Sequence, residues 1–337
     1  FAIWQNAGSS WKCHHDESEW RSHCLLSRYR RKEIIVSNPG NSTRAIFYAL
    51  GANLGIFAAK LAAALFTGSG AMLAEAVHSL ADCGNQGLLL LGMKRAKLPA
   101  TPDFPLGYGK ETYFWSFLVA LMLFSVGGAF SVYEGIHKLS HPEPLEKPWL
   151  AIAVLVFSIV LEWLSLRACL QEINQAREKN SLWHWFRESR NSEMIVLFGE
   201  QLAALLGLAF ALAAIGISMI TGNPLYDAIG TIGIGVLLIV IAIFVAIEIK
   251  ALLIGESAAP ARRKEIEDYL HSHPDTMEIH NVITLQLGPE IMVSVKVGMD
   301  PELRTGDLIR QINKIKVDMR QKFPEIKWLF FEPDNHA

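Results

Sequence analysis

The sequence predicts an α-helical membrane protein with six transmembrane helices followed by a small α+β domain, and three observations support this. Of the 337 residues, 51% are hydrophobic, and the mean hydropathy is positive. Six apolar stretches approach or exceed the roughly 20 residues that a helix needs to cross a bilayer. After residue 254 charged residues return and the pattern becomes that of a globular domain. We therefore divide the chain into a flexible arm (residues 1–41), a transmembrane domain (42–254) and a cytoplasmic domain (255–337).

The six predicted spans cover residues 45–66, 70–93, 114–139, 150–170, 194–220 and 225–249. Lys and Arg gather before the first span, after the second, after the fourth and after the sixth, and the other loops carry few. Because positive residues collect in cytoplasmic loops, both termini are predicted to face the cytoplasm. We expect a multi-pass protein of a bacterial plasma (inner) membrane in preference to an organelle membrane.

The cytoplasmic domain is predicted from alternating and amphipathic patterns. Residues 260–271 indicate a helix, and residues 281–287 and 291–297 indicate two strands joined at Gly288 and Pro289. An amphipathic helix over 303–323 and a strand over 327–331 follow. The order αββαβ predicts a small ferredoxin-like sandwich with its helices on one face of the sheet.

Composition and charge exclude several classes of function. The formal net charge of −2 leaves no basic field for a nucleic-acid partner. Cys83 and Cys169 fall inside spans, where small apolar packing residues are common, so no disulfide framework is predicted. The loops contain no recognisable catalytic set, so we expect neither an enzyme nor a prosthetic group, and a membrane metallohydrolase ranks low.

The arm offers a separate set of metal-ligand types, which are Cys13, His14, His15, His23 and Cys24. Cysteine and histidine are the usual ligands of structural zinc. Their spacing matches no established zinc pattern, so a flexible arm is the favoured interpretation.

The second span carries a histidine and two acids on one helical face. His78 and Asp82 are four residues apart, and Glu75 precedes His78 by three. A charged group near the middle of a membrane helix costs roughly 2.5–3.5 kcal/mol, so it usually marks an ion path or a buried partner. An imidazole nitrogen together with carboxylate oxygens suits Zn(II) in tetrahedral geometry.

The remaining candidate ligands come from other spans. Glu200 is the only acid deep in the fifth span, Gln201 lies beside it, and Asn53 of the first span offers another amide oxygen. We therefore predict a metal ion held by His78, Asp82 and Glu200, with Gln201, Asn53 and Glu75 as accessory positions. With a single histidine, this oxygen-rich set also suits Mn(II) or Fe(II).

Structural interpretations of the same residues stay open. His78 and Asp82 can hydrogen-bond each other and hold helices together, as polar pairs between spans do. Asn53 and Glu75 are as well explained by helix packing as by metal binding. Glu162 of the fourth span is interpreted as a satisfied buried pair near Arg167. Asp227 is interpreted as a helix-start residue that favours the helix dipole.

Two stretches resemble a known family. Residues 67–82 (TGSGAMLAEAVHSLAD), continuing to Asn85 and Gln86, resemble the signature of the cation diffusion facilitator family, the proton-coupled exporters of zinc and related divalent metals. The loop GYGKE at 107–111 and the following YFWSF at 113–117 are similar to that family's second cytoplasmic segment. The similarity extends over residues 42–333.

The resemblance implies a homodimer in the lipid membrane. Each protomer would carry one intramembrane site built from spans two and five, exchanging cytoplasmic Zn(II) for protons by alternating access. The family's second ligand of span five falls at Ala204, so this chain has fewer fixed charges at the site. That shortage motivates an alternative, a transport-inactive scaffold or metal sensor with the same fold.

The resemblance also implies further histidine ligands that this chain lacks. Phe104 and Tyr108 stand where loop histidines of the family bind a second metal, and Phe330 stands at a ligand position of the last strand. His271, His273 and His280 do not reproduce the family's cluster. We therefore expect one metal per protomer and a cytoplasmic domain held together by packing.

Overall fold

The computed structural model describes residues 39–67, 70–140, 148–177, 181–223 and 225–334. Within these ranges the side chains of residues 39–41, 67, 70–75, 77 and 148 lie outside the description. Most of the predicted arm, including its five cysteine and histidine residues, also falls outside the described ranges.

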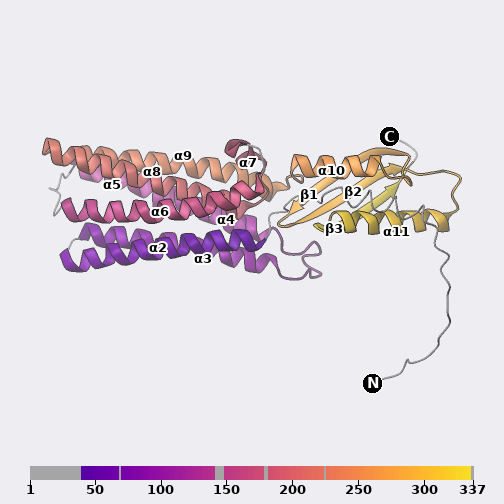
Figure 1. The fold of residues 1–337 in the computed structure, drawn as a ribbon, viewed down its shortest axis with the longest axis horizontal. Helices are drawn as coiled ribbons and strands as arrows, with labels where there is room; N and C mark the ends of the chain where they lie inside the picture. The colour runs from indigo at the N-terminus through magenta and orange to yellow at the C-terminus, as the bar shows by residue number, and fades with distance from the viewer. Residues whose placement is uncertain (1–38, 68–69, 141–147, 178–180, 224, 335–337) are drawn as a thin grey trace, which may run out of the picture. The chain divides into compact units, whose positions relative to one another are not determined.

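Long helices occupy every predicted span (Figure 1). The first two are α2 (Pro39–Thr67) and α3 (Gly70–Ala96). The third span is one helical run made of α4 (Glu111–Met122), the π-helical segment η1 (Leu123–Ala129) and α5 (Phe130–Ser140). The last three are α6 (Pro148–Ala176), α8 (Ser192–Thr221) and α9 (Leu225–Ile254).

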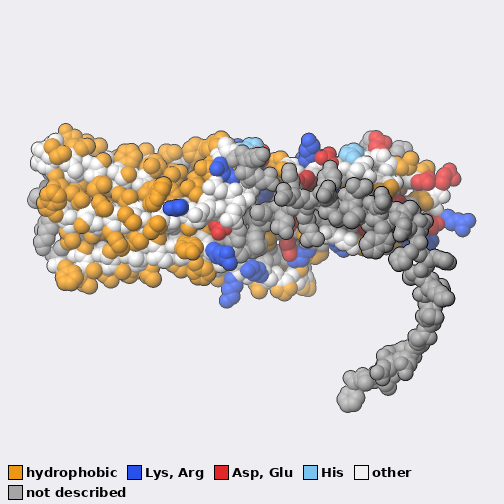
Figure 2. Space-filling model, in the orientation of Figure 1, with side chains coloured by type: hydrophobic (Ala, Val, Ile, Leu, Met, Phe, Trp, Pro, Cys, Tyr) orange, Lys and Arg blue, Asp and Glu red, His pale blue; other side chains and the backbone are white. Residues whose placement is uncertain are grey.

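Five helical segments of the described chain are long and apolar enough to cross a membrane. They correspond to α2, the α4–η1–α5 run, α6, α8 and α9. α3 is not among them, because its 27 residues include Glu75, His78, Asp82, Asn85 and Gln86. These polar residues lower the hydropathy of α3, so a membrane crossing by this second predicted span stays a prediction. Figure 2 shows hydrophobic side chains covering much of the visible surface over the long helices.

Close helix packing holds the third span against the sixth. A Cβ atom added at Gly128 would overlap Ile239, and one added at Gly235 would overlap Val132. Small residues let membrane helices approach closely enough for their backbones to contact. The α4–η1–α5 run can therefore lie directly on α9.

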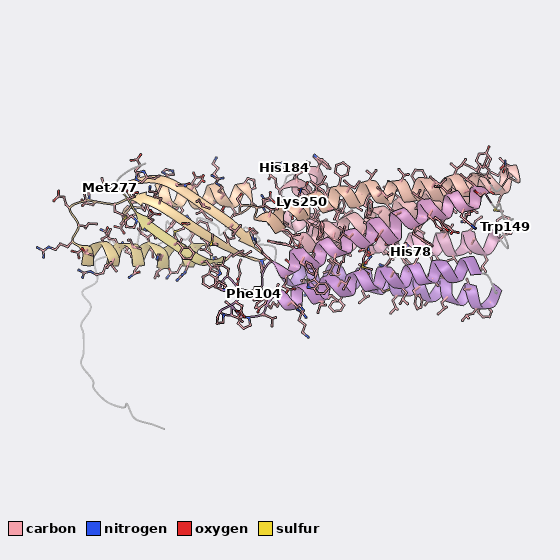
Figure 3. All side chains as sticks on the ribbon, turned by 180° about the vertical axis from the view of Figure 1, so that it is seen from behind. His78, Phe104, Trp149, His184, Lys250 and Met277 are labelled. Carbon is pink, nitrogen blue, oxygen red and sulfur yellow. The ribbon has the colours of Figure 1, made fainter. Side chains whose placement is uncertain are left out.

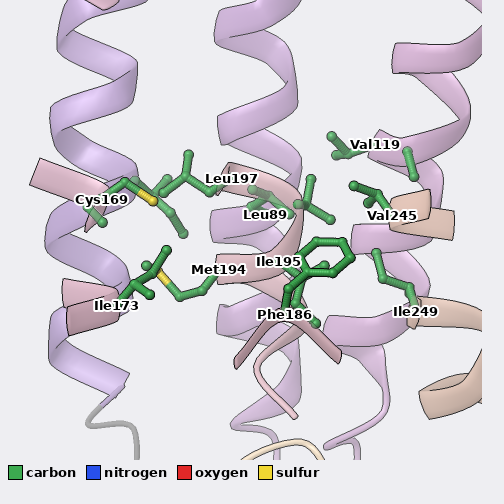
Figure 4. Packing of buried hydrophobic residues seen from close by; sticks show 14 of the residues in the cluster. Leu89, Val119, Cys169, Ile173, Phe186, Met194, Ile195, Leu197, Val245 and Ile249 are labelled. Carbon is green, nitrogen blue, oxygen red and sulfur yellow. The ribbon is translucent and has the colours of Figure 1, made fainter. Parts of the chain in front are cut away.

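An apolar cluster fills the bundle near the ends of the helices that carry the basic loops (Figure 4). Leu89, Ile195, Leu197 and Ile249 are almost completely buried in it. The cluster includes Phe186 of α7 (Leu182–Glu188), a short helix that the sequence did not predict. Ser181 begins this helix, and its hydroxyl accepts a hydrogen bond from the His184 backbone N–H at 3.1 Å, a regular N-cap.

The C-terminal domain has the predicted order of elements. It consists of α10 (Pro260–His271), β1 (Glu278–Leu287), β2 (Glu290–Gly298), α11 (Thr305–Lys322) and β3 (Ile326–Pro333). The three strands form one sheet in the order β1-β2-β3, with β1 antiparallel and β3 parallel to β2. α10 and α11 share one core with Val293, Val295 and Val297 of β2.

Hydrogen bonds join the β1–β2 turn to the start of α4. The Gly288 backbone N–H donates to the Tyr113 hydroxyl at 2.8 Å, and Tyr113 is completely buried. Gly288 has a φ of +67°, which glycine adopts without strain. A side chain at Gly109 would overlap the Leu287 carbonyl. Gly109 of the GYGKE loop is therefore required for this close contact.

Candidate metal centre

One face of α3 gathers the polar side chains of the second span. His78, Asp82, Asn85 and Gln86 follow one another at intervals of four, three and one residues, which places them along one side of the helix. Asn85 and Gln86 are buried at 4% and 0% exposure, whereas His78 and Asp82 are half-buried. Figure 3 labels His78 part-way along the helical bundle.

Glu200 of α8 points toward this face of α3. Its side chain is buried, and each carboxylate oxygen accepts one hydrogen bond from an amide of α3. Asn85 Nδ2 donates to Oε1 at 3.0 Å, and Gln86 Nε2 donates to Oε2 at 2.9 Å. Two donors compensate a buried carboxylate far better than none, because an ionised group without partners is expensive to bury.

Asn53 of α2 extends this network to a third helix. Its Nδ2 donates to Gln86 Oε1 at 3.3 Å, and its side chain is buried. The fixed amide of Gln86 thus connects Asn53 to Glu200. Gln86, which was not among the predicted ligands, therefore links the predicted accessory residue Asn53 to the predicted ligand Glu200.

Asp82 lies near a second and a third carboxylate. Its charge acts on Glu200 of α8 and also on Glu162 of α6. Three acids from three helices are therefore near enough for their charges to influence one another. A divalent cation is the kind of group that reduces the mutual repulsion of such acids.

The remaining predicted accessory positions are Gln201 and Glu75. Gln201 is buried at 1% exposure, and neither its amide oxygen nor its amide nitrogen has a hydrogen-bond partner. Glu75 lies in α3, but its side chain is outside the described ones. No three His, Cys, Asp or Glu side chains among the described residues are grouped so as to hold a metal ion. The ligand set of His78, Asp82 and Glu200 therefore stays a prediction.

A buried lysine escaped the sequence interpretation of the spans. Lys60 of α2 is 6% exposed, and its charge acts on Glu162, which is 3% exposed. The interpretation of Glu162 as a satisfied pair with Arg167 is wrong, because Arg167 is exposed and Glu162 Oε2 has no hydrogen-bond partner. The two lie five residues apart, which turns them to different faces of α6. A lysine within an apolar stretch was the available signal for this region.

Asp227 lies in the first turn of α9, as predicted for a residue that favours the helix dipole. It also forms an ion pair with Lys138 of α5 at 3.2 Å. This pair joins the C-terminal end of α5 to the N-terminal end of α9. It adds a polar contact to the close packing of the same two helices.

The positions where family histidines are absent hold other contacts. The rings of Phe104 and Tyr108 lie 4.7 Å apart, centroid to centroid. In the C-terminal domain, His273 Nε2 lies 3.6 Å from Asp318, and His280 Nε2 lies 3.2 Å from the Asp334 carbonyl oxygen. These histidines have separate partners. Phe330 is half-exposed on β3.

The transmembrane domain and the C-terminal domain each match a known family model. Residues 46–254 match the cation efflux transmembrane domain, and residues 258–329 match the cytoplasmic domain of cation efflux proteins. The proton-coupled zinc antiporter SLC30A9, mitochondrial, of Mus musculus is 31% identical over 303 residues, which cover 89% of this chain and 52% of that protein. Metal tolerance protein C4 of Arabidopsis thaliana is 29% identical over 267 residues, covering 79% of this chain and 58% of that protein.

A bacterial relative is more distant. The cation-efflux pump FieF of Salmonella newport is 24% identical over 268 residues, covering 79% of this chain and 83% of the pump. The chain thus spans about half the length of the antiporter relatives and most of the bacterial pump.

The preference for a bacterial plasma membrane is wrong. The relatives from Mus musculus and Homo sapiens, each 31% identical, are named mitochondrial. The distribution of Lys and Arg orients a protein within a membrane but does not identify which membrane it occupies. The transmembrane match covers more than half of this sequence and agrees with the motif on α3 and the acid on α8. The chain belongs to the cation diffusion facilitator family of metal cation transporters.

Proposed function

We propose that this protein exchanges a divalent cation, Zn(II) in the first place, for protons across a membrane. The cation is bound by His78, Asp82 and Glu200, with Asn53, Gln201 and Glu75 in accessory roles. One intramembrane site serves each protomer, and the site opens alternately to the two sides. The position of Glu200 carries this proposal, since it brings a second helix's carboxylate to the polar face of α3.

Competition between protons and the metal ion for the same ligands would couple metal transport to proton transport. Carboxylates and imidazole bind metal only when deprotonated, so metal binding releases protons and a pH gradient can drive transport. Histidine suits this exchange because its charge changes near physiological pH. Asn85 and Gln86 would stabilise the Glu200 carboxylate when the cation is absent.

The relatives support a proposal for the protein's assembly and location. The match of residues 258–329 to the family's cytoplasmic domain supports a homodimer, because that domain is the dimerising part in the family. A mitochondrial membrane is the proposed location, because the antiporters of mouse and human carry that designation. In that membrane the basic loops would lie together on one side.

Transport in proteoliposomes tests the function. Purified protein is reconstituted, and Zn(II) uptake is followed with and without an imposed pH gradient. We expect uptake that depends on the gradient, and Asp82→Ala should reduce it to the level of protein-free liposomes. Asp103→Ala is the matched control, because Asp103 is an exposed acid in the loop after α3. Unchanged uptake in the Asp82→Ala protein would contradict the site assignment.

The identity of the cation needs competition experiments. Only one histidine is available, and oxygen ligands accept harder ions such as Mn(II) and Fe(II). Uptake of Zn(II) is measured against increasing Mn(II) and Fe(II). Stronger inhibition by either ion than by unlabelled Zn(II) would show that the site prefers that ion to Zn(II).

The second candidate function is a transport-inactive scaffold or metal sensor. Ala204 lacks the carboxylate that the family pattern has, and both oxygens of Glu200 already accept hydrogen bonds. Isothermal titration of the purified protein with Zn(II) and Mn(II) separates the scaffold from the transporter. The absence of binding that depends on His78 favours the scaffold. Binding that His78→Ala abolishes, without uptake into proteoliposomes, favours the sensor.

A further inference from the structure

A stripe of polar residues runs along the buried face of α6. Ser158, Glu162 and Ser165 follow at intervals of four and three residues and are 0%, 3% and 4% exposed. Neighbours such as Val160 and Trp163, on the other faces of the helix, are 51% and 54% exposed. The stripe therefore faces the interior of the bundle, where α6 packs against α2 and α8.

All three residues of the α6 stripe have an oxygen without a hydrogen-bond partner. These atoms are Ser158 Oγ, Glu162 Oε2 and Ser165 Oγ, and all are inaccessible to solvent. A buried polar group left unpaired costs roughly 1–3 kcal/mol, and the hydrocarbon region supplies no water to compensate. Such groups call for an explanation, and an ion that binds there is one.

The α6 stripe reaches the depth of the predicted site. Asp82 and Glu162 each lie 14 residues before the last residue of their helices, and both helices end at basic loops. The charge of Asp82 acts on Glu162, and Glu162 in turn acts on Glu200. Glu162 of α6 could therefore supply the carboxylate that α8 lacks at Ala204.

We propose that Glu162 is a third carboxylate ligand of the transported cation, alongside Asp82 and Glu200. This inference rests on the proposed transport function. The described residues hold no ready cluster of three such groups, so binding requires α3, α6 and α8 to close around the cation. The ligand set becomes richer in oxygen, so Glu162 should contribute more to binding of Mn(II) than of Zn(II).

A purely structural role for Glu162 makes a different prediction. Lys60 of α2 is buried, and its charge acts on Glu162, so the acid could serve only to neutralise the lysine. In that case, removing both charges should restore cation binding, because a buried ion pair can be replaced by neutral residues of similar volume. A ligand role predicts that binding stays weak after both charges are removed.

The test compares four variants by isothermal titration with Zn(II) and Mn(II) and by uptake into proteoliposomes. These are Glu162→Gln, Lys60→Met, the double variant of both, and Glu172→Gln. The last is the matched control, a half-buried acid nearer the basic end of the same helix. We expect Glu162→Gln and the double variant to bind Zn(II) at least about tenfold more weakly, since even indirect support of a metal ligand is worth about 10- to 100-fold. The control should bind like the wild type.

Each other outcome is decisive. Wild-type affinity in Glu162→Gln, or recovery of affinity in the double variant, overturns the ligand role. If Glu162→Gln does not fold, Glu162→Asp replaces it, because aspartate keeps the charge near Lys60 but retracts the carboxylate by one methylene. Wild-type affinity of Glu162→Asp would then overturn the proposal. Loss of uptake in Asp82→Ala with full uptake in Glu162→Gln defeats this inference alone, whereas a wild type without uptake defeats the proposed function as well.

Discussion

The buried polar layer of the membrane domain contrasts with the apolar cluster at the core of the C-terminal domain. In the membrane domain, Glu200 is held by amides of α3, while Gln201 and Glu162 have buried polar atoms without partners. The core of the C-terminal domain is a continuous apolar cluster that includes Val295 and Ile315. The difference teaches that the C-terminal core is built for stability, whereas the membrane domain keeps costly polar groups that the proposed cation site would use.

The largest expected effect on stability comes from the C-terminal core. Ile315 of α11 is completely buried, so Ile315→Ala should lower the free energy of unfolding by about 2–5 kcal/mol. Hydrogen exchange of the β2 amides measures the change. Ile309→Ala is the matched control, because Ile309 of the same helix is 53% exposed and should change stability by less than about 0.5 kcal/mol. Weakened Zn(II) binding in Ile315→Ala would break the separation between the two regions.

In contrast to Ile315→Ala, Glu200→Ala should affect Zn(II) uptake strongly and stability less. It leaves the amides of Asn85 and Gln86 without their acceptor, which costs roughly 1–3 kcal/mol, but it also removes a buried carboxylate. The net loss of stability should therefore be smaller than for Ile315→Ala, while Zn(II) uptake is abolished. Thermal unfolding and uptake are measured on the same preparation. Retained uptake would show that this acid serves packing and not transport.

Tyr113→Phe tests the contact between the two regions. The variant removes the acceptor of the Gly288 N–H, so we expect a loss of about 1 kcal/mol that is confined to the β1–β2 turn. Hydrogen exchange of the Gly288 amide should become faster. Tyr133→Phe is the control, because Tyr133 is 64% exposed and its hydroxyl should matter little. Equal exchange in both variants would contradict a role for the Tyr113 hydroxyl.

The smallest expected effect is a change in pH dependence at Glu256, which follows α9. Partial burial raises the pKa of this carboxyl above its ordinary value, and Arg190, with its Nη2 at 2.9 Å, offsets part of the rise. Because the folded state binds this proton more tightly, stability should decrease as pH rises from the ordinary pKa through the raised one. Glu256→Gln should flatten that part of the stability profile, whereas Glu302→Gln, at an exposed site, should leave it unchanged. A steeper decline in Glu256→Gln would contradict the sign.

Much of the fold could be predicted from the sequence because periodicity acts within single elements. The helix at α10 has the predicted bounds, and the predicted strands fall within β1, β2 and β3. The predicted face of α3 that carries His78 and Asp82 follows from 3.6 residues per turn. The short helix α7 was missed because seven residues give too little periodic signal.

The sequence by itself determined the apolar spans, the αββαβ order and which α3 residues share a face, because these depend on local spacing. Only the tertiary structure decided that Asn85 and Gln86 bind Glu200, and that Glu162 faces the interior while Arg167 faces out. The physical reason is that burial and hydrogen bonding between helices depend on how separate segments pack. Residue spacing along one helix fixes directions around its axis, but the neighbours in those directions come from distant parts of the chain.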